Sequence, residues 1–225
     1  MKNVYVREVD QKLLEQLKKV SLSMFRKGFF SIFRGSISAR MGATRFLINK
    51  NNAVFDNLDE ESFIVLQDKL DYRWREASMD VGIHASIYRH FTEARFIAYG
   101  RPPHAIAYSL TNEYLIPKDY LGATLLGSKI EIYDPKSYKD WQDRSSVDIL
   151  HYLQASKRHF IFIRGCGIVV YHRELQGLLK MLDLIEGSCE ILQFANFTQT
   201  HRGDPLSHKE TPPPARALPE QTSQS

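Results

Sequence analysis

Apolar residues recur at two different spacings along this chain. Between Val9 and Lys27 they fall three or four positions apart, which is typical of one face of a helix, and Gly28 marks its expected end. Elsewhere they alternate with polar residues or form short runs, as in half-buried or buried strands. The predicted strands are residues 35–40, 45–48, 95–99, 129–133, 160–163 and 168–171.

Helical patterns separate these strands. A helix that Ser78 or Asp80 would cap is predicted over 81–91, and Pro102-Pro103 opens another. Strands joined by the glycine-bearing turn 164–167 indicate a hairpin. The order predicts an α/β fold of three α/β/α layers, with a central mixed, largely antiparallel sheet flanked by helices. Further helices are predicted over 58–63 (leading into 64–66), 146–156 and 174–197.

The strand at 95–99 ends against Pro102-Pro103, so a strand end meets a helix start there. Such junctions at the rim of a sheet often hold the chemistry of α/β proteins. Side chains two positions apart on a strand share a face, and Tyr99 and Arg101 are therefore expected to point into the same space.

Composition narrows the class of protein. The chain of 225 residues has 43% hydrophobic and 25% charged residues, an ordinary globular composition. The net charge of +4 is spread over the sequence, so neither a nucleic-acid partner nor a membrane is expected. Two cysteines, Cys166 and Cys189, cannot form a disulfide framework, and no apolar leader precedes the first helix. The expected location is the cytoplasm.

A change of composition near residue 204 divides the chain. From there to residue 225 the sequence is rich in Pro, Ser and Gln and has few large apolar groups. Such a segment cannot offset the entropy of ordering and is predicted to be disordered. The expected organisation is one domain over 1–203 and a tail over 204–225.

Several motifs occur in an order that resembles the class II aldolase and adducin head family, over roughly residues 10–197. Gly35-Ser36-Ile37-Ser38-Ala39-Arg40 is similar to the family's Gly-Asn-Val-Ser-Ala-Arg turn. His84-Ala85-Ser86-Ile87-Tyr88 resembles its His-Leu-Ala-Ile-Tyr helix. The other matches are Phe46-Leu47-Ile48, Pro102-Pro103 and Gly167-Ile168-Val169-Val170.

The resemblance implies a metal site that this chain does not reproduce. The family's enzymes hold a zinc-like ion with three histidines, and the matching positions are Tyr99, Arg101 and Cys166. The catalytic carboxylate of the family falls on Asp80. An arginine carries its own positive charge and cannot ligate a cation. No metal ligand and no cofactor are therefore expected.

The family's phosphate-binding loops are altered as well. The first loop has Ser36 in place of asparagine, and Met79 replaces one of two paired serines. Ser36, Asn51 and Ser78 remain as hydrogen-bond donors for an anion, with Arg101 as a positive charge. The predicted ligand-binding residues are Ser36, Asn51, Ser78, Arg101 and His104, which lies at the start of the helix after the double proline.

Two functions from different classes follow. The first is a non-catalytic protein that binds a small anion such as a sugar phosphate, with Arg101 paired to Asp80 in the former metal site, or that acts by assembly. The alternative is an aldehyde-lyase or epimerase acting on a sugar phosphate through a metal-free or unusual site, with zinc held in part by Cys166. The resemblance also implies a homo-oligomer, a tetramer in many of the family's enzymes.

Overall fold

An eight-stranded sheet forms the centre of the computed structural model, which describes residues 9–202 (side-chain environments through 198). The strand order is β3-β2-β1-β4-β8-β7-β6-β5. Every neighbouring pair is antiparallel except β6 and β7, so the sheet is mixed and largely antiparallel, as predicted. The strands are β1 (Ser36–Arg40), β2 (Arg45–Asn49), β3 (Phe63–Gln67), β4 (Phe96–Gly100), β5 (Tyr114–Leu115), β6 (Ile130–Tyr133), β7 (Phe160–Ile163) and β8 (Gly167–His172).

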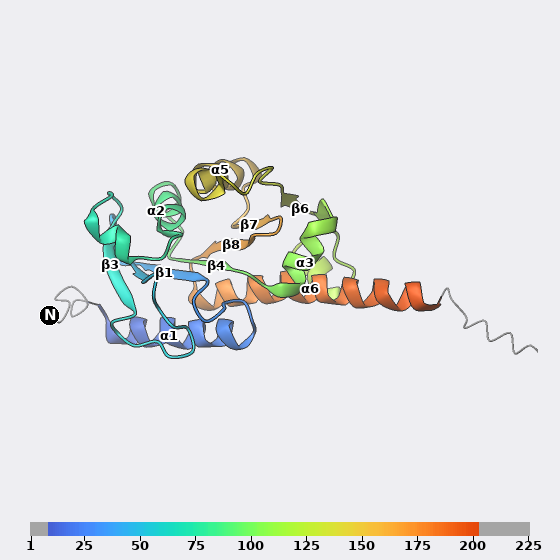
Figure 1. Cartoon of the computed structure of the whole chain (residues 1–225), viewed down its shortest axis with the longest axis horizontal. Helices are drawn as coiled ribbons and strands as arrows, with labels where there is room; N and C mark the ends of the chain where they lie inside the picture. The colour runs from blue at the N-terminus through green and yellow to red at the C-terminus, as the bar shows by residue number, and fades with distance from the viewer. Residues whose placement is uncertain (1–8, 203–225) are drawn as a thin grey trace, which may run out of the picture.

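Helices cover both faces of this sheet. Figure 1 shows α1 and α6 below the sheet and α2 and α5 above it, which confirms the predicted three layers. The distal part of α6 extends past the sheet. The helices are α1 (Gln11–Arg26), the 3-10 helix η2 (Tyr72–Glu76), α2 (Val81–His90), α3 (Pro103–Thr111), α4 (Tyr120–Leu125), α5 (Trp141–Ser156) and α6 (Leu175–Arg202).

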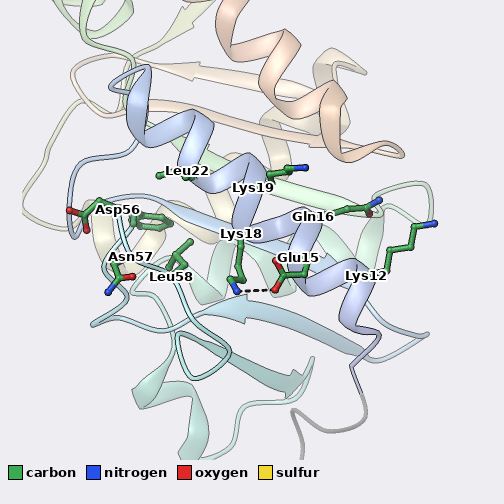
Figure 2. A pocket seen from close by; sticks show the side chains of 10 residues that line it. Lys12, Glu15, Gln16, Lys18, Lys19, Leu22, Asp56, Asn57 and Leu58 are labelled. Atoms are coloured by element: carbon green, nitrogen blue, oxygen red, sulfur yellow. Dashed lines mark hydrogen bonds and ion pairs between the residues drawn. The ribbon is translucent and has the colours of Figure 1, made fainter.

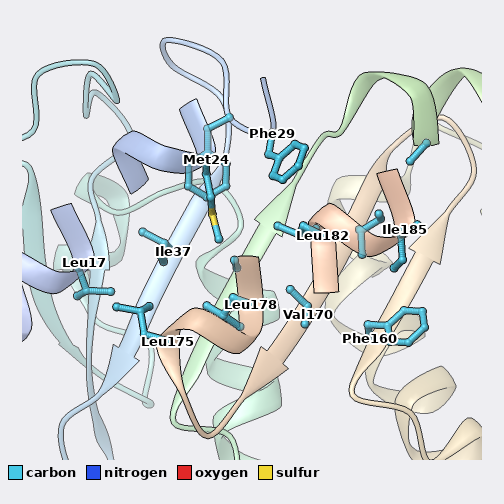
Figure 3. Packing of buried hydrophobic residues seen from close by; sticks show 14 of the residues in the cluster. Leu17, Met24, Phe29, Ile37, Phe160, Val170, Leu175, Leu178, Leu182 and Ile185 are labelled. Atoms are coloured by element: carbon cyan, nitrogen blue, oxygen red, sulfur yellow. The ribbon is translucent and has the colours of Figure 1, made fainter. Parts of the chain in front are cut away.

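Each face of the sheet has its own apolar cluster. Along β4, Ala98 packs with the α1–α6 cluster, whereas Ile97 and Tyr99 belong to the α2–α5 cluster. This alternation is the two-residue period of a strand. In Figure 3, Leu182 and Ile185 of α6 lie against the sheet in the first cluster. Complete burial of such a side chain contributes about 1.5–3 kcal/mol. The second face carries the site described below.

The predicted helix over 58–63 is wrong. This stretch forms a turn in which the Asp59 carboxylate accepts from the Ser62 amide at 2.7 Å, and the Ser62 hydroxyl accepts from the Asp59 amide at 3.1 Å. Asp and Ser side chains compete with helical hydrogen bonds in this way. The helix predicted from residue 146 begins five residues earlier, at Trp141. Strand β5 and helix α4 were not anticipated.

Two further expectations concern the chain as a whole. None of the helices within residues 9–202 is both long enough and apolar enough to cross a membrane. The predicted disordered tail over 204–225 lies outside the described residues, as do residues 1–8.

Candidate functional site

A cavity of about 420 Å³ opens at the end of β4, on the face covered by α2 and α5. Residues from several separate stretches of the sequence line it, and they include three cationic side chains and one acidic one. We call it the β4 pocket. Its lining comprises Phe33, Arg34, Gly35, Asn49, Lys50, Asn51, Ser78, Met79, Asp80, Ile83, Tyr99, Arg101, Trp141, Gln142, Ser145 and Cys166.

Backbone pairing brings two of these stretches together. Lys50 and Ala77 form an isolated antiparallel bridge, and the Ser78 amide donates to the Asn49 carbonyl at 3.0 Å. The buried Asn49 side chain accepts from the Ile37 amide at 2.8 Å, which fixes the end of β2 against β1. The loop after β2 and the segment before α2 therefore form one wall of the pocket.

The three positions that resemble metal ligands do meet in this pocket. Tyr99 is the penultimate residue of β4, Arg101 follows the strand, and Cys166 lies in the turn before β8. The next residue, Gly167, has φ +130°, and a Cβ atom there would collide with the Gly100 carbonyl oxygen. Glycine thus lets the Cys166 turn approach the end of β4 closely.

These side chains do not suit a divalent cation. Burial raises the pKa of the Cys166 thiol, although the Arg101 charge and a hydrogen bond from Tyr99 oppose that shift. Burial also raises the pKa of the Tyr99 hydroxyl. A metal ion needs deprotonated ligands, but the thiol of Cys166 and the hydroxyl of Tyr99 favour their neutral forms, and Arg101 beside them is a cation. Within residues 9–202, no group of three or more His, Cys, Asp or Glu is arranged to hold a metal ion.

Asp80 occupies the N-cap position of α2, without a side-chain capping bond, and its carboxyl group faces the pocket. Burial is the largest influence and raises its pKa; hydrogen bonds from Ser36 and Ser78 and the charges of Arg101 and Arg34 lower it. The ion pairs of the described residues do not include Arg101 with Asp80. The expected guanidinium–carboxylate pair is therefore absent, and Arg101 acts on Asp80 over a longer distance.

The structure brings most of the predicted site residues together. Asn51, Ser78 and Arg101 line the pocket with Asp80, whereas Ser36 is completely buried beneath it. His104 lies outside the lining. Its imidazole Nδ1 is 2.9 Å from the carboxylate of Glu186 on α6, on the opposite face of the sheet.

Several lining residues were not predicted. Arg34 precedes the Gly35 turn, and its position beside that motif was the one available signal. Trp141, Gln142 and Ser145 belong to the first turns of α5, and all three precede the predicted start of that helix at residue 146. Gln142 donates to the Met79 carbonyl at 2.9 Å and so ties α5 to the rim of the pocket.

A second hollow, of about 480 Å³, lies between α1 and the loop at 55–58. Figure 2 shows Lys12, Lys18 and Lys19 around it, with Lys18 paired to Glu15 at 2.9 Å. Its walls are side chains of one helix and one short loop, and none of the predicted site residues lies there. The β4 pocket is therefore the stronger candidate.

Comparison with known proteins agrees with this fold. A family model described as the class II aldolase and adducin N-terminal domain matches residues 15–193. A comparison with curated proteins found no match.

Solved structures resemble the chain over most of its length. The l-fuculose-1-phosphate aldolase of Thermus thermophilus aligns with a TM-score of 0.74 and 22% identity, covering 85% of this chain and 97% of the other. YgbL of Escherichia coli, a putative aldolase/epimerase/decarboxylase, aligns with a TM-score of 0.69 and 17% identity. This alignment covers 82% of this chain and 89% of the other. A sugar-phosphate aldolase of Thermotoga maritima aligns with a TM-score of 0.63 and 13% identity, covering 83% of this chain and 97% of the other. At these identities the likeness concerns the fold.

Proposed function

Because the chain belongs to the class II aldolase and adducin N-terminal domain family, we propose that its β4 pocket binds a small anionic molecule without metal-dependent catalysis. The observation that carries the proposal is the charge of the lining. Arg34, Lys50 and Arg101 line the cavity, and Asp80 is the one acidic residue of that lining. A partly enclosed pocket lined by an excess of cations favours an anion.

A phosphate ester or a carboxylate of sugar size is the ligand class we propose. The guanidinium groups of Arg34 and Arg101 present planar sets of donors that match the oxygens of such groups. Asn51 and Ser78 add neutral hydrogen-bond donors to the same wall. The structural neighbours include aldolases of sugar phosphates, which supports this class of ligand for a related pocket.

The absence of catalysis is part of the proposal and is supported by the donor chemistry. Arg101 supplies a fixed positive charge where the resemblance places a metal ligand, and it can stabilise a bound anion electrostatically. It cannot offer the open coordination position of a Lewis acid. A cytoplasmic setting, which we also propose, is consistent with Cys166 and Cys189 both being free thiols.

The alternative is an aldehyde-lyase or epimerase that acts without the family's ligand set. Asp80 favours it, because its raised pKa would suit a general acid or base within the pocket. This alternative needs a second group that stabilises the developing negative charge, and Arg101 is the candidate. Turnover of a sugar phosphate by the purified protein, lost in Asp80→Asn, would favour it over a purely binding role.

Assembly is the second role we propose, alongside ligand binding. Large apolar side chains are exposed on α4 and on the distal part of α6, which pack against each other. The Ser188 hydroxyl on α6 donates to Asp119 at the start of α4 at 2.6 Å, so the two helices present one surface. We call it the α4–α6 surface. Its exposed apolar residues are Tyr120, Leu121, Leu125, Ile191, Phe194 and Phe197.

A thermal-shift screen tests the binding proposal. Sugar phosphates, inorganic phosphate and small carboxylates are added to the wild type, to Arg101→Gln and to the control Arg89→Gln. Arg89 lies at the end of α2, outside the pocket lining. A ligand at ten times its Kd contributes about 1.4 kcal/mol, which raises the Tm by roughly 3–5 °C in a domain of this size. We expect that rise in the wild type and Arg89→Gln, and its loss in Arg101→Gln.

A further inference from the structure

Helix α2 and strand β1 present polar side chains to each other inside an otherwise apolar layer. Asp80, His84 and Tyr88 are four residues apart on the helix, and Ser36 and Ser38 are two apart on the strand. Four helical residues advance about 6 Å, and two strand residues advance about 6.7 Å. The two rows therefore stay in register and alternate along their contact.

The distances show that hydrogen bonds link Ser36, His84, Ser38 and Tyr88 in that order. The Ser36 hydroxyl lies 2.8 Å from Nε2 of His84, and the Ser38 hydroxyl lies 2.7 Å from Nδ1 of the same ring. Ser38 is also 2.8 Å from the Tyr88 hydroxyl. At the other end, Ser36 acts on the Asp80 carboxyl group as a hydrogen-bond donor that lowers its pKa, and the Ser78 hydroxyl lies 3.5 Å from Oδ2 of Asp80. We call this series the Tyr88–Asp80 chain. Ser36, Ser38 and His84 are completely buried.

Counting donors gives this chain one direction. Within the described residues, Ser38 is the one hydrogen-bond partner of the buried Tyr88 hydroxyl, so the Tyr88 hydroxyl is satisfied as a donor only when it donates to Ser38. Ser38 then donates to Nδ1 of His84. A neutral imidazole has a single N–H, which must be on Nε2 and donates to Ser36. Ser36 is left to donate to Asp80, and every donor is used once.

Other arrangements leave a buried donor without a partner. If His84 were charged, both ring nitrogens would donate, and either the Ser38 or the Tyr88 hydrogen would have no acceptor in the chain. If the direction were reversed, the Tyr88 hydrogen would have none. A buried donor without a partner is unfavourable, because it gives up its hydrogen bond to water and gains none in the protein. Burial independently lowers the pKa of His84 to about 3, which agrees with a neutral ring.

We propose that the Tyr88–Asp80 chain directs a hydrogen-bond donor at the Asp80 carboxyl group, and that this carboxyl group, when protonated, donates a hydrogen bond to an anion in the β4 pocket. His84 is then a positioning residue that acts on Asp80 through Ser36. The part of this inference that concerns the ligand rests on the proposed function. The direction of the chain does not.

The surroundings of Asp80 agree with a proton on its carboxyl group. Burial raises the pKa of this carboxyl group, and the nearby groups that oppose the shift are Ser36, Ser78, Arg101 and Arg34. Tyr99 also faces Asp80 and stays neutral because burial raises its own pKa. A protonated Asp80 would remove the one negative charge of the lining and donate a hydrogen bond to a phosphate or sulfate oxygen.

The tautomer of His84 tests the chain directly in the wild-type protein. Long-range ¹H–¹⁵N spectra distinguish a protonated from an unprotonated ring nitrogen, and His84→Gln assigns the signals. We expect the neutral ring with its proton on Nε2 from pH 5 to pH 8. A ring protonated on Nδ1, or a doubly protonated ring at pH 6, would overturn the proposal.

Sulfate binding tests the positioning role, because sulfate stays a dianion over this pH range. Its affinity should rise as the pH falls and Asp80 takes up a proton. Ser36→Ala removes a hydrogen bond that stabilises the carboxylate, so it raises the pKa of Asp80 and moves the midpoint of the profile to higher pH. Loss of the fixed orientation should also weaken binding about tenfold. Ser36 is fully buried and does not line the pocket, so it does not touch the ligand.

Ser21→Ala is the matched control. Ser21 is a completely buried serine of α1 that lies outside the pocket lining. The Ser21→Ala variant should leave the midpoint unchanged. If both variants behave alike, the positioning role is wrong even though binding stands. If the wild type binds no sulfate, the proposed function fails, and the tautomer alone decides whether the chain has the stated direction.

Discussion

Single residues set the electrostatics of the β4 pocket. Arg101 brings a guanidinium charge to the lining, whereas burial favours the neutral forms of Asp80, Tyr99 and Cys166. The pocket therefore gains positive charge as the pH falls and Asp80 takes up a proton. A thiol in this setting is a poor nucleophile, because the thiolate is the reactive form.

Cys166 is expected to be alkylated slowly at pH 7. Its pKa is raised, so the thiolate fraction is small and grows only at a pH above that of a free cysteine. Arg101→Gln should slow the reaction further, because the Arg101 charge lowers this pKa. Iodoacetamide labelling, followed by mass spectrometry of the Cys166 peptide, measures the rate, with unfolded protein as the reference.

Rapid labelling at pH 7 would contradict this account. Stoichiometric zinc in the purified protein, lost in Cys166→Ser, would contradict it as well. Either result would favour the alternative of an enzyme with an unusual ligand set.

Part of the site could be predicted from residue spacing. Tyr99 and Arg101 share the pocket, because the two-residue period of β4 continues one step past the strand. The role of His84 was not predictable, since it depends on the register of α2 against β1. His104 illustrates the same limit. Pro102-Pro103 predicted where the helix starts, but the contact of His104 with Glu186 depends on how α6 packs against that helix.

At the scale of elements, Glu186 of α6 holds the start of α3. Its carboxylate accepts from the His104 amide at 3.0 Å and from the Ala105 amide at 2.7 Å. Pro102 at the N-cap position provides no side-chain capping bond, so a side chain from another helix supplies the acceptor. This contact fixes the segment that follows Arg101.

Glu186→Ala is expected to lower the free energy of unfolding by about 2–3 kcal/mol, because it leaves amides at the start of α3 without their acceptor. Glu190→Ala, one turn further along α6, does not affect those amides and should change stability by less than about 0.5 kcal/mol. Chemical denaturation monitored by circular dichroism measures both. Equal effects of the two changes would show that the α3 contact contributes little.

Elements were predictable where their periodicity was strong. The α1 pattern and the β7–β8 hairpin match the structure closely, since apolar spacing and a glycine turn define them. Residues 58–63 had a helical composition, but local bonds between Asp59 and Ser62 stabilise a turn. Short elements such as β5 and α4 depend on packing against distant segments, which spacing alone does not reveal.

At the scale of the whole molecule, ligand binding and assembly occupy different regions. The β4 pocket lies on the α2–α5 face, whereas the α4–α6 surface includes the part of α6 that extends past the sheet (Figure 1). Phe194 and Leu125 are each 60% exposed on that surface. Clustered exposure of this kind marks a contact region more often than scattered apolar residues do.

Light scattering should therefore give a mass greater than the 26.1 kDa of one chain. The double change Leu125→Lys and Phe194→Lys should shift the protein toward the monomer, because it places charges on the contact surface. Leu70→Lys is the control, since Leu70 is exposed between β3 and η2. A wild type that is monomeric at micromolar concentration would contradict the assembly proposal.

The central claim is that Arg101 gives this pocket an anion-binding role. Isothermal titration calorimetry of inorganic phosphate or a small phosphate monoester, with the wild type and with Arg101→Gln, tests it most directly. We expect saturable binding to the wild type and at least a tenfold weaker affinity in the variant, because one charge-assisted contact is lost. Binding of equal strength to both proteins, or no binding to the wild type by any of these anions, would contradict the claim.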